Sequence, residues 1–567
     1  MTPTRWGAVP ARVRDGAPVV TVPVSLAVVG GLHLVSALPA LRTPLPAYTD
    51  EVAYLANAQL IAGLGSARTI DTDPFAIGWS VLLAPAFQLA HAPQSIYLLA
   101  MTLSIVMGAA VVVPLHMLAR TFPIHGWIAA GIATAVAAAP ARAMYSGFAT
   151  AENLFTLLCA IAVYSGIRLL RRPAWPSAYG VAVASAGAFV VHGRGIVLVA
   201  GGLLALALTA RALGCRVLVP MALSIAVSTA GYLGYRVIGD TVFPSSTDRE
   251  SEVIGNLIGS DPAALLLSGI GQSWYQLVAW LGIPLLAAVV AISALVREVR
   301  ERRVGPALWL VAIGVATAVL SVAQIHRSYE AVIDARWDLF VYGRYNDPIA
   351  SIAVVLALAW LWARSSRSWR LPVAAAAATT VVGAFILFSL PRIPAQGWLN
   401  VINVGGLTPW RWPAFQLWQF SSATEAPWIL AGGVALTGMV LVLLAATSRS
   451  RAVRAVTAGL LIVTAGVGTV RGSVTTAAFA APFREGFTAY TAVEPGATVA
   501  FVTEGADFTS TINYQFLLFR NPVKLVENAS DADGAEYAVT RAAAEVPAEW
   551  IPIARDAVFD NVIYRVP

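Results

Sequence analysis

Apolar windows separated by short polar segments repeat along most of the chain. A helix needs about 20 mainly apolar residues to cross the roughly 30 Å hydrocarbon core of a bilayer. The segment 76–90 is short and interrupted by Pro85, so we expect it to be re-entrant or interfacial. The pattern predicts about thirteen transmembrane helices, near residues 19–41, 95–118, 126–144, 153–170, 178–192, 195–211, 217–238, 273–295, 305–323, 347–363, 371–390, 428–446 and 455–470.

After residue 470 the hydropathy falls and the pattern changes. A helical pattern covers 509–519, and short runs of β-forming residues surround it. The predicted strands are 498–504, 523–527, 536–541, 551–555 and 561–566. We therefore divide the chain into a transmembrane domain, residues 1–470, whose first outer loop is 42–94, and a small α/β domain, residues 471–567.

Composition and charge support this division. The chain is 58% apolar and 12% charged, with a mean hydropathy of +0.72, which is typical of a multi-pass membrane protein and not of a soluble one. The arginines concentrate in short loops on one side of the predicted helices, which places the N-terminus in the cytoplasm and the C-terminal domain outside. No basic run with interleaved aromatic residues indicates a nucleic-acid partner. The preference for Arg over Lys is typical of a GC-rich bacterial genome.

The cysteines and one acidic tripeptide are candidates for metal chemistry. Cys159 and Cys215 lie in or beside apolar windows, without the spacing of a metal site or a disulfide framework. Asp71 and Asp73 form a D-x-D tripeptide, which is too common to indicate a bound divalent ion. We therefore predict neither a metal site nor a cofactor.

An acidic, glycine-containing segment, residues 46–75, directly follows the first predicted span. Its adjacent Asp50 and Glu51 precede an amphipathic pattern that predicts a short helix over 52–64. Two interpretations remain open. Asp50 can cap the helix while Glu51 interacts with its positive end, or the pair can supply a general base where a lipid-borne substrate meets an aqueous acceptor.

The sequence of this segment, YTDEVAYLANAQLIAGLG, resembles the first-loop motif of GT-C glycosyltransferases. The resemblance is to the family-39-like members, the protein mannosyltransferases and aminoarabinose transferases, whose motif is roughly D-E-x-x-Y-x-x-x-A-x-x-L-x-x-G. Asp50, Glu51, Tyr54 and Ala58 match it. Ile61 replaces the Leu, and Gly63 or Gly65 lies near the final Gly.

Three further stretches resemble motifs of the same family, and they occur in the same order along the chain and on the same predicted side of the membrane. YSGFATAENLF (145–155) contains Glu152 before a predicted helix. VVHGRGIVL (190–198) resembles a basic turn and contains His192 and Arg194. YGRYNDPIA (342–350) resembles an Arg-Tyr-x-x-Pro stretch and contains Arg344 and Tyr345.

The resemblance implies a GT-C-like helical fold. It also implies an enzyme of the cell envelope that transfers a sugar from a polyprenyl-phosphate donor to an extracytoplasmic glycan, lipid or protein acceptor, generally without a metal. We expect Asp50 to be the general base and Glu51 to position a sugar. Arg344 is the first candidate for the phosphate, because a guanidinium binds two oxygens and stays charged. The other candidate substrate-binding residues are Glu152, which can pair with an outer Arg or hold the acceptor, and His192, Arg194, His326, Arg327 and Tyr345.

Two other classes of protein also fit a chain with many membrane spans. A transporter or lipid flippase is the main alternative, although transporters often show two related halves, and no internal repeat is visible here. A third possibility is a scaffold of the cell envelope without enzymatic activity, whose outer domain binds a glycan or a partner.

Overall fold

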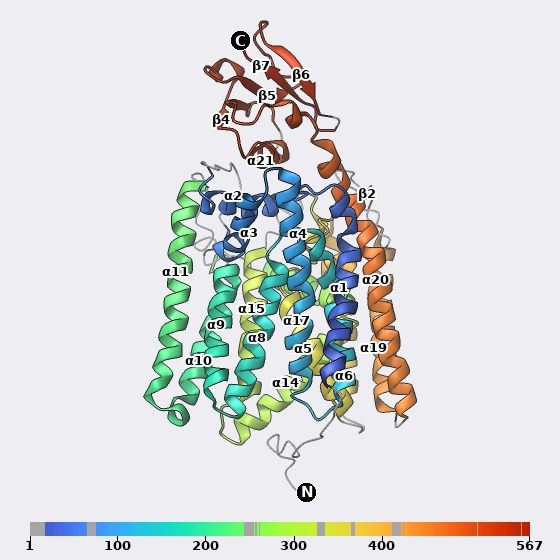
Figure 1. Ribbon diagram of the computed structural model, residues 1–567. Helices are drawn as coiled ribbons and strands as arrows, with labels where there is room; N and C mark the ends of the chain where they lie inside the picture. Colours follow the sequence, from blue (N-terminus) through green and yellow to red (C-terminus); the bar gives the residue numbers. More distant parts are fainter. Residues whose placement is uncertain are drawn as a thin grey trace.

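The computed structural model describes residues 18–567, apart from 65–74, 243–254, 256–257, 260, 326–334, 364–368, 411–420, 423, 449, 507 and 557. A helical bundle carries a small sheet domain at one end, and helix α1 (Pro18–Arg42) begins at the other end (Figure 1). The fold is therefore the predicted one, an α-helical multi-pass membrane protein with a small C-terminal α/β domain.

Nine helices or continuous helix pairs among the described residues are long and apolar enough to cross a membrane. The C-terminal one, α20, is 36 residues long. The nine are α1, α4 (Pro93–Ala110) with α5 (Val112–Ala119), α8 (Glu152–Arg171), α10 (Ile196–Leu213), α11 (Leu218–Val242), α15 (Pro306–Ile325), α18 (Arg370–Ala384) and its extension to Arg392, α19 (Glu425–Thr447) and α20 (Arg451–Gly486).

The remaining predicted spans are bent or shorter than expected. Helix α6 (Gly126–Ala137) bends by 61° into α7 (Pro140–Ala143) and the turn that follows it. The window 273–295 is not one straight helix, because α13 (Pro262–Ala279) meets α14 (Ile283–Arg300) at 110°. Helices α9 (Trp175–Val191) and α17 (Asp347–Ala363) have 17 residues each. Each predicted window thus contains a helix, but only nine to eleven spans among the described residues meet the length criterion.

The segment between α1 and α4 contributes two short helices at the end of the bundle that faces the sheet domain (Figure 1). Helix α2 (Thr49–Ile61) begins three residues earlier than predicted, so Asp50 and Glu51 lie in its first turn. Tyr48 occupies the N-cap position without a side-chain capping bond, so Asp50 is not the capping residue. Helix α3 (Ile77–Leu89) has only 13 residues and covers the segment predicted to be re-entrant or interfacial.

The C-terminal domain contains a five-stranded sheet with the order β4-β3-β5-β7-β6. Strand β3 is parallel to β4 and β5, while β7 is antiparallel to both β5 and β6. All five predicted strands and the predicted helix are present, as β3 (Val499–Val502), β4 (Val523–Val526), β5 (Tyr537–Arg541), β6 (Ile551–Arg555), β7 (Asn561–Arg565) and α21 (Phe508–Leu517). The boundary at residue 471 stays a prediction, since α20 continues to Gly486.

Candidate active site

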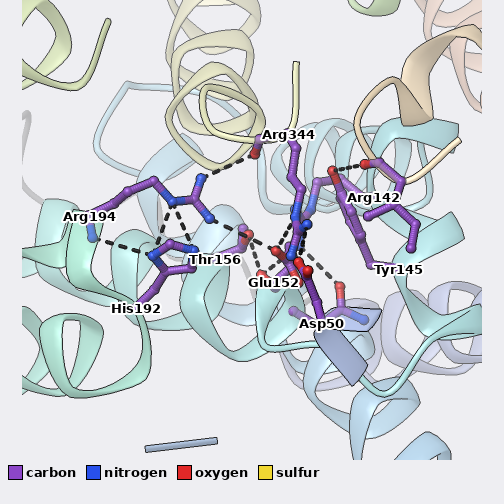
Figure 2. A network of polar contacts seen from close by, with 10 residues as sticks. Asp50, Arg142, Tyr145, Glu152, Thr156, His192, Arg194 and Arg344 are labelled. Atoms are coloured by element: carbon purple, nitrogen blue, oxygen red, sulfur yellow. Dashed lines mark hydrogen bonds and ion pairs between the residues drawn. The ribbon is translucent and has the colours of Figure 1, made fainter. Parts of the chain in front are cut away.

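Four charged side chains from distant parts of the chain meet in one cluster (Figure 2). One of the elements that carry them, α2, lies at the end of the bundle that faces the sheet domain (Figure 1). Asp50 lies in the first turn of α2, and Glu152 is the first residue of α8. Arg194 lies in the short 3-10 helix η2 (Gly193–Gly195) between α9 and α10, and Arg344 lies shortly before α17. Since ends of several helices meet here, residues almost 300 positions apart become neighbours.

Arg344 joins the two carboxylates. Its Nη1 lies 2.6 Å from Oδ2 of Asp50, and its Nε lies 2.5 Å from Oε1 of Glu152. The side chain of Glu152 is fully buried and that of Arg344 is 4% exposed, whereas that of Asp50 is 17% exposed. Burial alone would lower the pKa of Arg344, but Glu152 and Asp50 raise it well above its usual value. The guanidinium therefore stays charged, and Asp50 is the more accessible carboxylate.

Arg194 forms the second cationic group of this cluster. Its Cζ lies 4.0 Å from the ring centroid of Tyr345 and 4.9 Å from that of Phe155. Its Nη1 donates to the carbonyl oxygen of Arg344 at 3.3 Å, and its Nη2 lies 4.0 Å from Oε1 of Glu152. The ring faces and Glu152 hold this guanidinium beside the first one.

His192 shapes the turn that presents Arg194. Its Nδ1 accepts a hydrogen bond from the backbone N–H of Arg194 at 3.3 Å, and its ring lies 5.9 Å from that of Tyr345 (Figure 2). The structure therefore brings six of the predicted site residues into one cluster, namely Asp50, Glu152, His192, Arg194, Arg344 and Tyr345.

Glu51 has different partners from its neighbour Asp50. It is fully buried, and its Oε1 accepts hydrogen bonds from the hydroxyl of Tyr97 and from the N–H of Ala149, the latter at 2.7 Å. Its Oε2 accepts from the N–H of Ala47 at 2.9 Å. Burial raises the pKa of Glu51, and Arg484 is the strongest of the groups that oppose this rise. The expectation that Glu51 contacts a sugar stays a prediction.

Arg142 of α7 also belongs to this region, although it is not among the site residues predicted from the sequence. It is 1% exposed, and its Nη2 donates to Oδ1 of Asn153 at 3.1 Å and to the carbonyl oxygen of Glu152 at 3.4 Å. It thereby supports the start of α8 next to Glu152 (Figure 2). An arginine inside the apolar window 126–144 is the signal that could have revealed it, since charged residues within spans are usually functional and paired.

Other predicted candidates are not placed by the structure. His326 and Arg327 lie outside the described residues, as do Asp71 and Asp73. Within the described ranges, no group of three or more His, Cys, Asp or Glu side chains is arranged to hold a metal ion. The prediction that the protein works without a metal or cofactor remains open.

Comparison with known proteins identifies the fold. No family model matches the sequence, and no curated protein matches it either. ArnT from Cupriavidus metallidurans, solved with undecaprenyl phosphate, has a TM-score of 0.51 and 16% identity, with 96% of this chain and 97% of that chain covered.

Two further solved structures are similar over much of the chain. The arabinosyltransferase EmbB from Mycobacterium smegmatis has a TM-score of 0.41 and 15% identity, covering 86% of this chain and 42% of that one. The Archaeoglobus fulgidus oligosaccharyltransferase has a TM-score of 0.45 and 10% identity, covering 93% and 70%. The likeness to ArnT over nearly the full length of both chains shows that this protein has the GT-C fold.

Proposed function

We propose that the protein is an integral-membrane glycosyltransferase that moves a sugar from a polyprenyl-phosphate donor to an extracytoplasmic acceptor. The observation that carries this proposal is the cluster at the end of the bundle, where a partly exposed carboxylate, Asp50, pairs with the buried Arg344. A second buried cation, Arg194, lies 4.0 Å from Glu152, which Arg344 also contacts. This combination of a base and phosphate-binding groups suits displacement of a phosphate by an alcohol.

In the proposed reaction, Asp50 takes the proton of the acceptor hydroxyl. The acceptor oxygen then bonds to the anomeric carbon, while the bond from that carbon to the phosphate oxygen breaks and its electrons stay on the phosphate. Arg344 and Arg194 stabilise this growing negative charge. Glu152 contacts both guanidinium groups and holds them in place, while His192 and Tyr345 orient Arg194.

An apolar groove supports a donor that carries a lipid chain. It has a volume of about 420 Å³ and lies between α8, α14, α15 and α17. Apolar side chains such as Val163, Leu310 and Ile352 make up most of its wall, and Asn346, two residues from Arg344, also lines it. A polyprenyl chain in this groove would place its phosphate near the two arginines.

The proposed orientation puts the site outside the cytoplasm. The sheet domain and α2, which carries Asp50, lie at one end of the bundle, and α1 begins at the other (Figure 1). The arginine-rich short loops favour a cytoplasmic location for the end where α1 begins. Nucleotide sugars are not expected outside the cytoplasm, so a lipid-linked sugar is the suitable donor there.

Replacement of Asp50 by Asn tests the proposal. Asn keeps the size and a hydrogen-bond acceptor but removes the basicity, so we expect transfer to fall by roughly 10²- to 10⁴-fold. A deletion strain carrying either form would be compared by mass analysis of its envelope glycans, glycolipids and glycoproteins. Asp240→Asn, an exposed change near the end of α11, is the matched control. If the deletion strain lacks a sugar and the Asp50→Asn protein restores it as fully as the wild type does, the assignment of Asp50 as the general base is refuted. A transporter or scaffold would then fit better.

A further inference from the structure

Arg484 is a buried arginine near the end of α20, where the chain leaves the bundle for the sheet domain. The residue is 4% exposed. Its Nε donates to the carbonyl oxygen of Leu45 at 3.1 Å, and its Nη2 donates to that of Gly147 at 2.7 Å. Its Cζ also lies 5.6 Å from the ring centroid of Phe148. One guanidinium thus joins two segments that are about a hundred residues apart in sequence.

Glu51 joins the same two segments through their N–H groups. It accepts from Ala47 at 2.9 Å and from Ala149 at 2.7 Å. The hydroxyl of Tyr97 on α4 donates to Glu51 and accepts from Nη2 of Arg484 at 3.4 Å. The carbonyls and amides of segments 45–47 and 147–149 are therefore held together by one buried cation, one buried carboxylate and the tyrosine between them.

These two segments lead directly to the charged cluster. Leu45 precedes Asp50 by five residues, and Gly147 precedes Glu152 by five. Asp50 and Glu152 contact the same guanidinium, that of Arg344. The spacing between the two segments therefore limits the spacing of the two carboxylates on either side of Arg344.

We propose that Arg484 is a positioning residue. Together with Glu51 and Tyr97 it sets the separation of Asp50 and Glu152. It also links the end of α20, where the chain enters the C-terminal domain, to the proposed active site. The proposal rests on the proposed function only for its effect on catalysis. It assigns Glu51 a role through the backbone in place of direct contact with a sugar.

The chemistry of the two side chains explains why an arginine and a glutamate suit these positions. A guanidinium has a rigid, planar set of donors and binds two carbonyls at a fixed separation, whereas the ammonium of Lys donates from one atom on a flexible stem and fixes that separation less well. Its positive charge also opposes the rise in pKa that burial causes at Glu51. An ionised Glu51 can accept all three of its hydrogen bonds, whereas a protonated one would lose an acceptor site.

Arg484→Met, Arg484→Lys and the double variant Glu51→Gln/Arg484→Met test this proposal. Hydrogen–deuterium exchange of the full-length protein would be measured in residues 45–56 and 147–155, with the strands of the C-terminal sheet as the internal reference. We expect faster exchange in both segments of each variant and unchanged exchange in the sheet. The double variant should fold even if Arg484→Met does not, because it leaves no unpaired buried charge. Arg471→Met, at an exposed position of the same helix, is the control.

The functional measurement is made on the same variants. Binding of undecaprenyl phosphate, followed as a shift in unfolding temperature, should change little, while transfer in cells should fall about a hundredfold, as for a small displacement of catalytic groups. Arg484→Lys should recover part of the loss. Unchanged exchange in both segments, or an equal rise in the sheet, overturns the positioning role. If the wild type transfers no sugar, the proposed function fails, but the exchange measurement still decides whether Arg484 couples the segments.

Discussion

At the residue scale, the arrangement around Arg344 combines a chemical and a structural role. Its guanidinium lies between one fully buried carboxylate and one partly exposed carboxylate. Removing one partner of a buried pair leaves an uncompensated charge, which costs more than the pair itself contributes. The residue proposed to bind the phosphate is therefore also expected to be needed for a stable fold.

Arg344→Met should lower the free energy of unfolding by about 3–5 kcal/mol, because it leaves Glu152 buried without its nearest cation. Adding Glu152→Gln should restore part of this loss, since the second change removes the unpaired charge. Thermal or chemical unfolding of the purified protein in detergent measures both effects. Arg303→Met is the control, because Arg303 and Glu301 form an ion pair in which each side chain is about half exposed, and such pairs contribute about 0–1 kcal/mol. An Arg344→Met protein as stable as the control would contradict this account.

Sequence motifs located most of the cluster and gave Asp50 and Glu51 different roles, but they did not show that only Asp50 reaches Arg344. Adjacent residues on a helix point about 100° apart, so one reaches Arg344 and the other reaches Tyr97. Which one faces the cluster depends on how α2 packs against α4 and on the segment before α8, and neither contact leaves a local signal. Arg142 was missed for a related reason. It lies inside an apolar window, and its partners at the start of α8 become neighbours only after folding.

At the element scale, the angle between α13 and α14 shows what hydropathy cannot predict. The apolar pattern over 273–295 is continuous, yet the chain turns sharply at Leu281 and Gly282, which have φ values of 51° and 70°. Gly282 and the following Pro284 were the available turn signals. The turn allows α13 to pack against the segment 340–343 that presents Arg344.

A methyl group added to Gly271 of α13 should disturb that segment. A Cβ at this position would lie 1.8 Å from the carbonyl oxygen of Phe340, whereas a Cβ at Gly269 of the same helix would meet its nearest neighbour, Val322, at 3.9 Å. Gly271→Ala should therefore displace the backbone before Arg344, lowering both the unfolding temperature and the proposed transfer activity. Gly269→Ala should match or slightly exceed the wild type in stability, because Ala favours a helix by about 0.5–1 kcal/mol over Gly. Equal behaviour of the two variants would show that α13 does not position Arg344.

At the scale of the whole molecule, the positions of the helices and of the strands in the C-terminal domain could be predicted from the sequence more completely than the contacts within the site. Long apolar windows and β-forming runs are local properties, and the sheet formed where those runs predicted it. The start of the domain was harder to place. The upper part of α20 contains polar residues such as Arg471, Ser473 and Thr475, so its hydropathy falls while the helix continues to Gly486.

The proposed orientation can be tested with a native cysteine. Cys215 is exposed and lies in the connection between α10 and α11, while Cys159 is buried. Figure 1 shows this connection at the end of the bundle opposite the sheet domain. In intact cells, a membrane-impermeant maleimide should leave Cys215 unlabelled until the membrane is permeabilised. A cysteine introduced by Lys524→Cys in the sheet domain should be labelled at once. The reverse order would place the charged cluster on the cytoplasmic side and exclude the proposed donor chemistry.

Helix α20 would also connect the surrounding lipid to the proposed chemistry. Its 36 residues correspond to about 54 Å of helix, and along this length it exposes Leu460, Val463 and Val467 at its surface. Arg484 lies near its upper end. A transmembrane helix adjusts its tilt when the bilayer becomes thinner or thicker, so a change of tilt in α20 would pull on the backbone segments that Arg484 holds. Membrane thickness would then regulate the rate of this protein without any ligand at the site.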